Sequence, residues 1–168
     1  MISKFITKRK KVLVSLAMVC ATTAQAQVFL GGSGRIGYGN DVFVLGIVPE
    51  VGYEINEKWA VGAGLGMNMA AADGDSEVLG VAEPFIRFTP WQNKHVAFDI
   101  KAMAEMEFQN CLWGAEIGLR PSVRFFLNKH LDATVDFGIV GASYDGYDWS
   151  PALLFTGMNA QFGIAYKF

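Results

Sequence analysis

Long apolar runs, cysteine, proline and histidine are all scarce in this chain of 168 residues. Beyond residue 26, no run approaches the roughly 20 apolar residues of a membrane-spanning helix, which excludes a helical membrane protein. Only 5 prolines and 2 cysteines occur, and Cys111 is the one cysteine beyond residue 26, so the fold must hold without an internal disulfide. The two histidines, His95 and His130, offer little material for histidine-based chemistry.

Residues 1–26 are predicted to be a secretory signal peptide. A basic start precedes a mostly apolar stretch, Val12–Ala21, and the small-x-small sequence Ala24-Gln25-Ala26 predicts cleavage before Gln27. The apolar stretch is too short for a membrane anchor. A lipoprotein site at Cys20 is the weaker alternative, because bulky Val19 precedes that cysteine. The expected mature protein, residues 27–168, is a single domain.

Basic residues are few in that mature chain. Removing residues 1–26 removes five of the 14 basic residues and none of the 16 acidic ones, which leaves a net charge of −7. A nucleic-acid binder needs a basic face, so we expect no nucleic-acid partner. What is abundant instead is glycine, with 19 residues, and aromatic side chains, at 13%. Membrane-spanning β-strands fit this composition, because each needs only about 10 alternating residues.

Alternation is clearest in the last segment, Met158–Phe168, where one side is apolar from Met158 to Phe168 and the other is polar or small. This period of two residues predicts a strand with one apolar face. The whole mature chain divides into eight such segments and predicts an all-β, eight-stranded antiparallel up-and-down transmembrane barrel. The expected strands are Val28–Tyr38, Val42–Ile55, Trp59–Met69, Val78–Phe88, His95–Phe108, Trp113–Leu127, Leu131–Val140 and the terminal segment, with Ala70–Glu77 and Gly141–Pro151 as loops.

The charged residues of these segments all share one face, opposite the apolar one. Alternation alone does not say which face is inside, and a lipocalin-like barrel or a sandwich would bury the apolar face. The signal peptide, the even strand count and the aromatics near the strand ends favour charges inside and apolar residues outside. The charged residues expected inside are Arg35, Glu50, Glu54, Glu83, Arg87, Asp99, Lys101, Glu105, Glu107, Glu116, Arg120, Arg124, Asp132, Asp136 and Lys167.

Eight strands enclose only enough space for side chains, so these charges must pair or be hydrated. We expect an interior network in which Arg87, Arg120 and Arg124 are the central cations, together with Lys101, and in which Glu83, Glu105 and Glu116 are partners. Small residues such as Gly52 and Gly62 are expected to leave room for the arginines. The consequence is a plugged barrel that does not act as an open porin.

The end of the sequence resembles the terminal signal of bacterial outer-membrane barrels, with Gly163, Tyr166 and the final Phe168 as the assembly signal. Together with Arg87 after Pro84-Phe85, Pro121 and the turn Asn56–Trp59, the pattern resembles the small OmpX/OmpA-like outer-membrane barrels, as found in Bacteroidetes-type bacteria. The resemblance implies an outer-membrane location, both termini in the periplasm, a monomer, and as partners the lipid bilayer, lipopolysaccharide and the barrel-assembly machinery. It implies a non-enzymatic role in envelope integrity or surface interaction, without cofactors.

Other motifs are interpreted as structural. The acidic segment Asp73–Glu77 is too short for an EF-hand, and Gly32–Gly37 matches G-x-G-x-x-G without the strand and helix that give the motif meaning. We therefore expect no catalytic, cofactor or metal site, and we interpret Cys111 as an incidental thiol. Two alternatives stay open: a lipid A-modifying enzyme of the outer leaflet, and a soluble periplasmic barrel that binds an apolar ligand.

Overall fold

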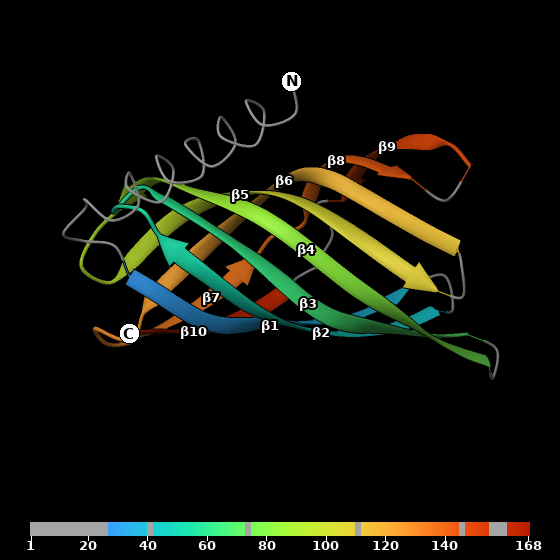
Figure 1. Ribbon diagram of the computed structural model, residues 1–168, viewed down its shortest axis with the longest axis horizontal. Coiled ribbons are helices and arrows are strands. Elements are labelled where there is room, and N and C mark those ends of the chain that lie inside the picture. The colour runs from blue at the N-terminus through green and yellow to red at the C-terminus, as the bar shows by residue number, and fades with distance from the viewer. Residues whose placement is uncertain (1–26, 40–41, 73–74, 110–111, 145–146, 155–160) are drawn as a thin grey trace, which may run out of the picture.

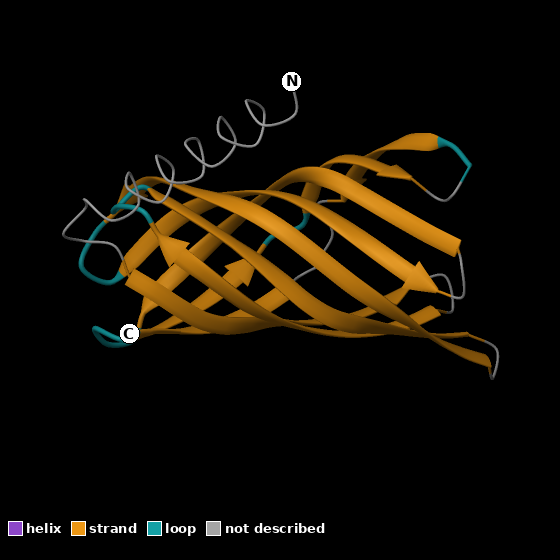
Figure 2. Ribbon diagram, viewed as in Figure 1, coloured by secondary structure: helices purple, strands orange, loops and turns teal. Residues whose placement is uncertain are grey.

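The computed structural model describes residues 27–39, 42–72, 75–109, 112–144, 147–154 and 161–168. The predicted signal peptide, Cys111 and Asp73 lie outside the described residues. The described chain is all β, as predicted (Figure 2). Its strands are β1 (Gln27–Gly39), β2 (Val42–Glu54), β3 (Trp59–Ala72), β4 (Asp75–Gln92), β5 (Val96–Gln109), β6 (Leu112–Phe126), β7 (Leu131–Asp136), β8 (Ile139–Tyr144), β9 (Trp149–Leu154) and β10 (Gln161–Lys167).

The strands form one closed antiparallel ring (Figure 1). Strands β1 to β6 pair with their neighbours in sequence order. Strands β7 and β8 both pair with β6, at different heights, and so share the seventh position around the ring. Strand β9 pairs with β8 and β10 pairs with β7, so these two share the eighth position, and β10 closes the ring against β1. The predicted eight-stranded closed barrel is confirmed.

Asparagine shapes the tight turns at one end of the barrel. Asn56, Asn93 and Asn128 each accept hydrogen bonds through the side-chain oxygen from the backbone N–H groups two and three residues later, at 2.8–3.0 Å. Such side-chain bonds are what make asparagine a turn residue. We call this the turn end; β1 begins and β10 ends there (Figure 1), and the backbone N–H of Phe168 donates to the carbonyl oxygen of Val28 at 3.1 Å. The opposite end is called the loop end.

Strand pairing extends further than alternation predicted. The expected loop Ala70–Glu77 is wrong, because β3 continues to Ala72 and β4 begins at Asp75. The expected loop Gly141–Pro151 is also largely wrong, since β8 and β9 pair from Ile139↔Leu154 to Tyr144↔Trp149. Ladder hydrogen bonds join backbone groups, so strands continue through small and polar residues that carry no alternating pattern.

The wall is inverted relative to a soluble domain. All fifteen charged side chains expected inside are buried or half-buried, and none is exposed. On the outside, 27 large apolar or aromatic side chains of the described residues are exposed, including Leu65 at 72% and Ile117 at 52%. Aromatics occur near both ends, with Trp59 and Tyr166 exposed at the turn end and Tyr38 exposed at the loop end. None of the described residues forms a helix long and apolar enough to cross a membrane, a finding that concerns helices only.

One residue breaks the alternation. Ser122 pairs with Asp136, and Leu119 pairs with Val140. Between these two pairs lie residues 137–139 of the seventh ring position but only residues 120 and 121 of β6. This is a β-bulge, and its extra residue is allowed by Gly138, whose φ of 108° favours glycine. Strict alternation along the expected strand Leu131–Val140 predicts that Ile139 shares the outer face with Phe137. That prediction is wrong, because the bulge turns Ile139 inward to 3% exposure.

Candidate functional site

The described charges of the lumen form two networks, and the first lies toward the turn end. Arg124 is 3% exposed, and its Nε lies 2.8 Å from Oδ2 of Asp99, which is fully buried. Its Nη1 lies 3.1 Å from Oε1 of Glu54 and 3.3 Å from Oδ2 of Asp132. A planar guanidinium with several donors can hold three carboxylates in this way. Arg124 therefore joins strands β2, β5 and β7 across the lumen.

Two further cations complete this inner network. Arg87 lies 2.7 Å from Oε1 of Glu54 through Nη2 and 4.0 Å from Oδ2 of Asp99 through Nε. Lys167 lies 2.9 Å from Asp132 and 3.1 Å from Glu54 through Nζ. The inner network thus contains three cations and three carboxylates and is electrically balanced. Its members are Glu54, Arg87, Asp99, Arg124, Asp132 and Lys167.

The second network begins near the middle of the barrel. Lys101 Nζ lies 2.7 Å from Oε1 of Glu83 and 2.8 Å from Oε1 of Glu50. Arg120 Nη1 lies 3.3 Å from Oε2 of Glu83 and donates to Oε1 of Gln161 at 2.8 Å. Glu83 is therefore shared between two cations, which offsets the desolvation of a carboxylate that is 1% exposed.

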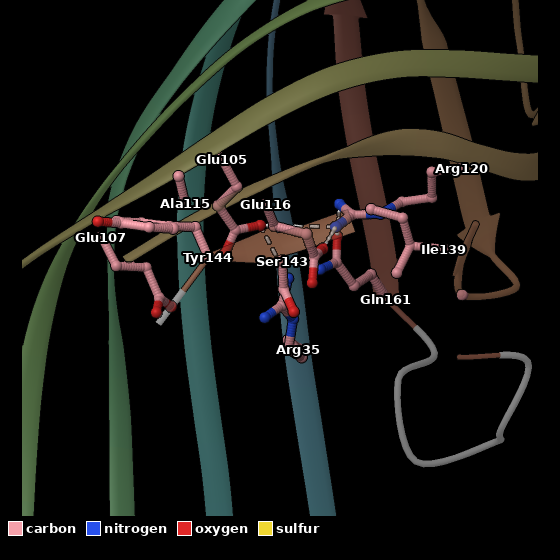
Figure 3. A pocket seen from close by; sticks show the side chains of 11 residues that line it. Arg35, Glu105, Glu107, Ala115, Glu116, Arg120, Ile139, Ser143, Tyr144 and Gln161 are labelled. Atoms are coloured by element: carbon pink, nitrogen blue, oxygen red, sulfur yellow. Dashed lines mark hydrogen bonds and ion pairs between the residues drawn. The ribbon is translucent and has the colours of Figure 1, made fainter. Parts of the chain in front are cut away.

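This outer network continues toward the loop end. Glu105 Oε2 lies 3.0 Å from Nη2 of Arg35 and 3.5 Å from Nη2 of Arg120, and Figure 3 shows the two arginines approaching it from different sides. Arg120 Nη2 also lies 3.8 Å from Oε1 of Glu116. Asn68 Nδ2 donates to Oε1 of Glu107 at 2.9 Å and to Oε1 of Glu105 at 3.3 Å. No described ion pair joins the outer network to the inner one.

Described residues of the lumen line a larger and a smaller cavity. The larger has a volume of about 260 Å³, and we call it the vestibule; its lining includes Arg35, Glu105, Glu107, Glu116 and Arg120 (Figure 3). The smaller has a volume of about 40 Å³ and is lined in part by Glu50, Lys101 and Asp136. Cavities with polar walls of this kind can hold water or a polar ligand.

The structure brings the predicted network residues together in two groups. Arg120 contacts all three predicted glutamates, Glu83, Glu105 and Glu116. Arg87 and Arg124 instead contact carboxylates that were assigned to the inner face but not named as partners: Glu54, Asp99 and Asp132. Alternation along the strands was enough to place these three carboxylates on the inner face. Which cation each one contacts depends on strand register and on closure of the ring, which the sequence pattern does not contain.

Aromatic rings fill the space that was assigned to the arginines. A Cβ on Gly52 would meet the ring of Phe29, and a Cβ on Gly62 would meet the ring of Phe85. Both rings are buried, and the cations lie over them: Arg87 Cζ is 5.0 Å from the Phe29 centroid and Lys101 Nζ is 4.3 Å from the Phe85 centroid. Gly52 and Gly62 therefore accommodate phenylalanine rings, and these two rings provide cation–π surfaces for the network.

The remaining predicted residues lie outside these networks. His95 and His130 are exposed at the turn end, where Nδ1 of His130 lies 3.0 Å from the carbonyl oxygen of Lys167. Tyr166 and Phe168 of the expected assembly signal are exposed on the outer wall with ring centroids 5.2 Å apart, and Gly163 faces the lumen between Ser33 and Thr134. Within the described ranges, no three histidine, cysteine or acidic residues are grouped so that they could hold a metal ion.

The described lumen thus contains a balanced inner network and an outer network with more carboxylates than cations. In the outer network, Arg35, Lys101 and Arg120 face Glu50, Glu83, Glu105, Glu107 and Glu116. The outer side of the wall is apolar. The Gly32–Gly37 segment lies within β1, and none of the described residues provides the helix that a dinucleotide site requires. A scan against protein-family models finds no family that matches this chain, and a search of the curated proteins finds no matching relative.

Proposed function

We propose that this chain is an integral outer-membrane β-barrel with a plugged, charge-filled interior and a non-enzymatic role in envelope integrity or surface interaction. The observation that carries the proposal is the inverted wall, with ions in the lumen and 27 large apolar or aromatic side chains exposed outside. Burying one such side chain is worth about 1.5–3 kcal/mol, and soluble monomers rarely expose apolar patches beyond a few hundred Å². A lipid environment would remove this exposed apolar surface from water.

The dimensions of the wall support the same proposal. Strands β1 to β6 contain 13 to 18 residues each, whereas a tilted membrane strand needs about 9–11. Exposed aromatic residues near both ends match the two interfacial belts of membrane barrels. In this proposal the turn end faces the periplasm, the loop end faces outward, and the partners are lipopolysaccharide and the machinery that inserts the barrel.

The interior favours a plugged membrane barrel over the two alternative functions, a carrier of an apolar ligand and a lipid A-modifying enzyme. Its larger cavity is lined chiefly by charged and polar side chains, which does not suit an apolar ligand. The two histidines both lie at the turn end, which would face away from the outer leaflet where lipid A is modified. The many short ion pairs of Arg124 and Lys101 occupy the space that an open pore would need.

Fractionation of a Gram-negative host that expresses the full chain tests the proposal. We expect the mature protein in the outer-membrane fraction, resistant to carbonate extraction, with faster migration in an SDS gel before boiling than after. The unboiled form reports the closed barrel, and the carbonate step reports insertion. Recovery of a monodisperse protein from the soluble periplasm without detergent would overturn the membrane assignment while leaving the barrel intact.

A further inference from the structure

Two neighbouring turns at the turn end carry the same three residues. Asn-Lys-His occupies positions 93–95 between β4 and β5 and positions 128–130 between β6 and β7. In both turns the asparagine side chain accepts two backbone hydrogen bonds at 2.8–2.9 Å, so the two turns share one local structure. The backbone N–H of Phe126 donates to the carbonyl oxygen of His95 at 2.9 Å and joins the two turns. The barrel therefore presents the same basic tripeptide twice at one part of its rim.

A pocket of about 450 Å³ is lined by both turns, and we call it the rim pocket. The lysines of the two turns, Lys94 and Lys129, both belong to its lining. The described lining contains one carboxylate, Asp132, whose Oδ2 lies 2.9 Å from Nζ of Lys167 and 3.3 Å from Nη1 of Arg124. Asp132 is thus already paired with two cations of the inner network. The two turn lysines therefore give the rim pocket a net positive charge.

The described protein does not compensate these two lysines. Both side chains are exposed, and among the residues that the structure describes no carboxylate oxygen lies within 4 Å of the ammonium group of Lys94 or of Lys129. On the third described turn of this end, Lys58 directly follows the exposed carboxylate of Glu57 and lies outside the lining of the rim pocket. A concave surface that carries one sign of charge attracts ions of the opposite sign. The rim pocket therefore favours an anionic ligand.

The rim pocket also reaches the apolar outer wall. Its lining includes Leu127, which is 58% exposed, and Phe126, whose ring centroid lies 5.3 Å from Nζ of Lys167. Exposed aromatic side chains at this end, Trp59 and Tyr166, mark the level where a membrane barrel meets lipid headgroups. Ammonium groups beside apolar surface at that level match a ligand with an anionic head and an apolar tail.

We propose that the rim pocket binds the headgroup of an anionic phospholipid, with Lys94 and Lys129 contacting its phosphate and Leu127 contacting the start of an acyl chain. Ammonium groups form charge-assisted hydrogen bonds to phosphate oxygens, and basic pockets at a membrane surface bind anionic headgroups. A volume of about 450 Å³ lies in the range of small-molecule sites. His95, in the same lining, adds a ring N–H donor. The inference rests on the proposed membrane function, because lipid reaches the pocket only when the apolar wall is inserted.

Lipid binding to the barrel, purified in detergent micelles after expression of the full chain, tests the site. Fractionation and heat-modifiable migration first verify that each sample is a closed, membrane-inserted barrel. Native mass spectrometry then counts the lipids retained from micelles that contain equal amounts of phosphatidylglycerol and phosphatidylcholine with the same acyl chains. We expect one retained phosphatidylglycerol, preferred at least about fivefold, because each lysine near a membrane surface contributes on that scale toward an anionic lipid. In the double variant Lys94→Gln/Lys129→Gln the preference should fall below about twofold.

Two controls separate the pocket from its alternatives. Lys58→Gln makes the same chemical change on the turn that does not line the pocket, and it should keep the preference. Glycerol 3-phosphate carries the same phosphate without acyl chains. It should bind at least about tenfold more weakly than phosphatidylglycerol, because it buries no methylene groups against Leu127.

Three results would overturn the site. They are equal retention of the two lipids by a verified barrel, an unchanged preference in the double variant, and an equal loss of preference in Lys58→Gln. Equal affinity for glycerol 3-phosphate and phosphatidylglycerol would overturn the lipid assignment in favour of a soluble phosphate compound. A verified outer-membrane barrel without the preference contradicts this site alone, whereas recovery from the soluble periplasm contradicts the membrane function before any lipid is added.

Discussion

Replacing Arg124 by methionine is expected to be among the most destabilising single changes in the lumen. The change removes the ion pairs of Arg124 with Asp99, Glu54 and Asp132 and its hydrogen bond to Thr89. Glu54 and Asp132 keep Lys167 at 3.1 and 2.9 Å, so they remain compensated. Asp99 is fully buried, and of its described partners the hydroxyl of Thr89 at 2.5 Å and Arg87 at 4.0 Å remain.

The expected loss of unfolding free energy is therefore set mainly by one carboxylate. Removing one partner of a buried ion pair costs about 3–5 kcal/mol, because the other charge stays buried. Urea unfolding of the barrel refolded into phospholipid vesicles, followed by tryptophan fluorescence, measures the loss as a shift of the midpoint. Asp99→Asn in the same chain removes the stranded charge, so the double variant should recover at least about 1–2 kcal/mol relative to Arg124→Met alone.

Lys58→Met is the matched control, since it removes a cation from an exposed turn. It should change stability by no more than about 0.5 kcal/mol. The reasoning would be refuted if the unfolding free energy of Arg124→Met lay within about 1 kcal/mol of that of the unmodified protein, because a change that small is close to the effect of an ordinary surface substitution. It would equally be refuted if the double variant were less stable than Arg124→Met, because the charge left on Asp99 would then not be the cause.

Three comparisons of variants and one recording test other parts of the structure. Leu65→Arg, at a side chain that is 72% exposed, should cost about 2–4 kcal/mol in vesicles if the outer wall meets lipid, and a change within 0.5 kcal/mol would mean that it meets water. Gly52→Ala should cost about 1–3 kcal/mol because its Cβ meets the Phe29 ring, whereas Gly34→Ala, with its nearest neighbours at 3.9 Å, should be near neutral; equal urea midpoints would contradict this. Asp136 is 6% exposed, and among the described residues none donates a hydrogen bond to its side chain. Asp136→Asn should therefore leave stability unchanged or raise it by about 1 kcal/mol, while Asp99→Asn lowers it, and the reverse order of midpoints would show that Asp136 is compensated. Planar bilayers should record no large stable conductance for the unmodified barrel, and porin-like steps would contradict the plug.

Alternation divided the chain into strands and put every charged residue of the expected strands on one face, and the signal peptide, the even strand count and the aromatics near the strand ends then favoured a barrel with that face inside. Arg87, Lys101 and Arg120 were placed inside because they share a phase with small and polar residues. The same reasoning failed at Ile139, because one extra residue at Gly138 changes the phase without changing the composition. It also failed at the strand ends, since β8 and β9 continue through small and polar residues that backbone pairing can join without an alternating pattern.

The partners within the lumen were harder to predict than its chemistry. Glu116 and Arg120 share the inward face of β6, so alternation predicts that both enter the lumen, although four residues of a strand span about 13 Å and only their long side chains bring the charges to 3.8 Å. The contact between Arg124 and Glu54 joins residues 70 positions apart on strands β6 and β2. Such a contact exists only after the ring has closed, and no pattern within one strand contains it. The acidic excess of the outer network was similarly hidden, because it depends on which charges the inner network has already neutralised.

The seam between β1 and β10 has a consequence for how the chain reaches this form. Phe29 pairs with Lys167, so the two strands of this seam lie almost at opposite ends of the described chain. Until they meet, both β1 and β7 offer unsatisfied backbone edges, and such edges invite pairing with other chains. Contacts between residues so distant in sequence also form slowly. Any state in which β10 has not docked therefore exposes two edges that can pair with other chains, and a chaperone that binds such a state would protect it from aggregation.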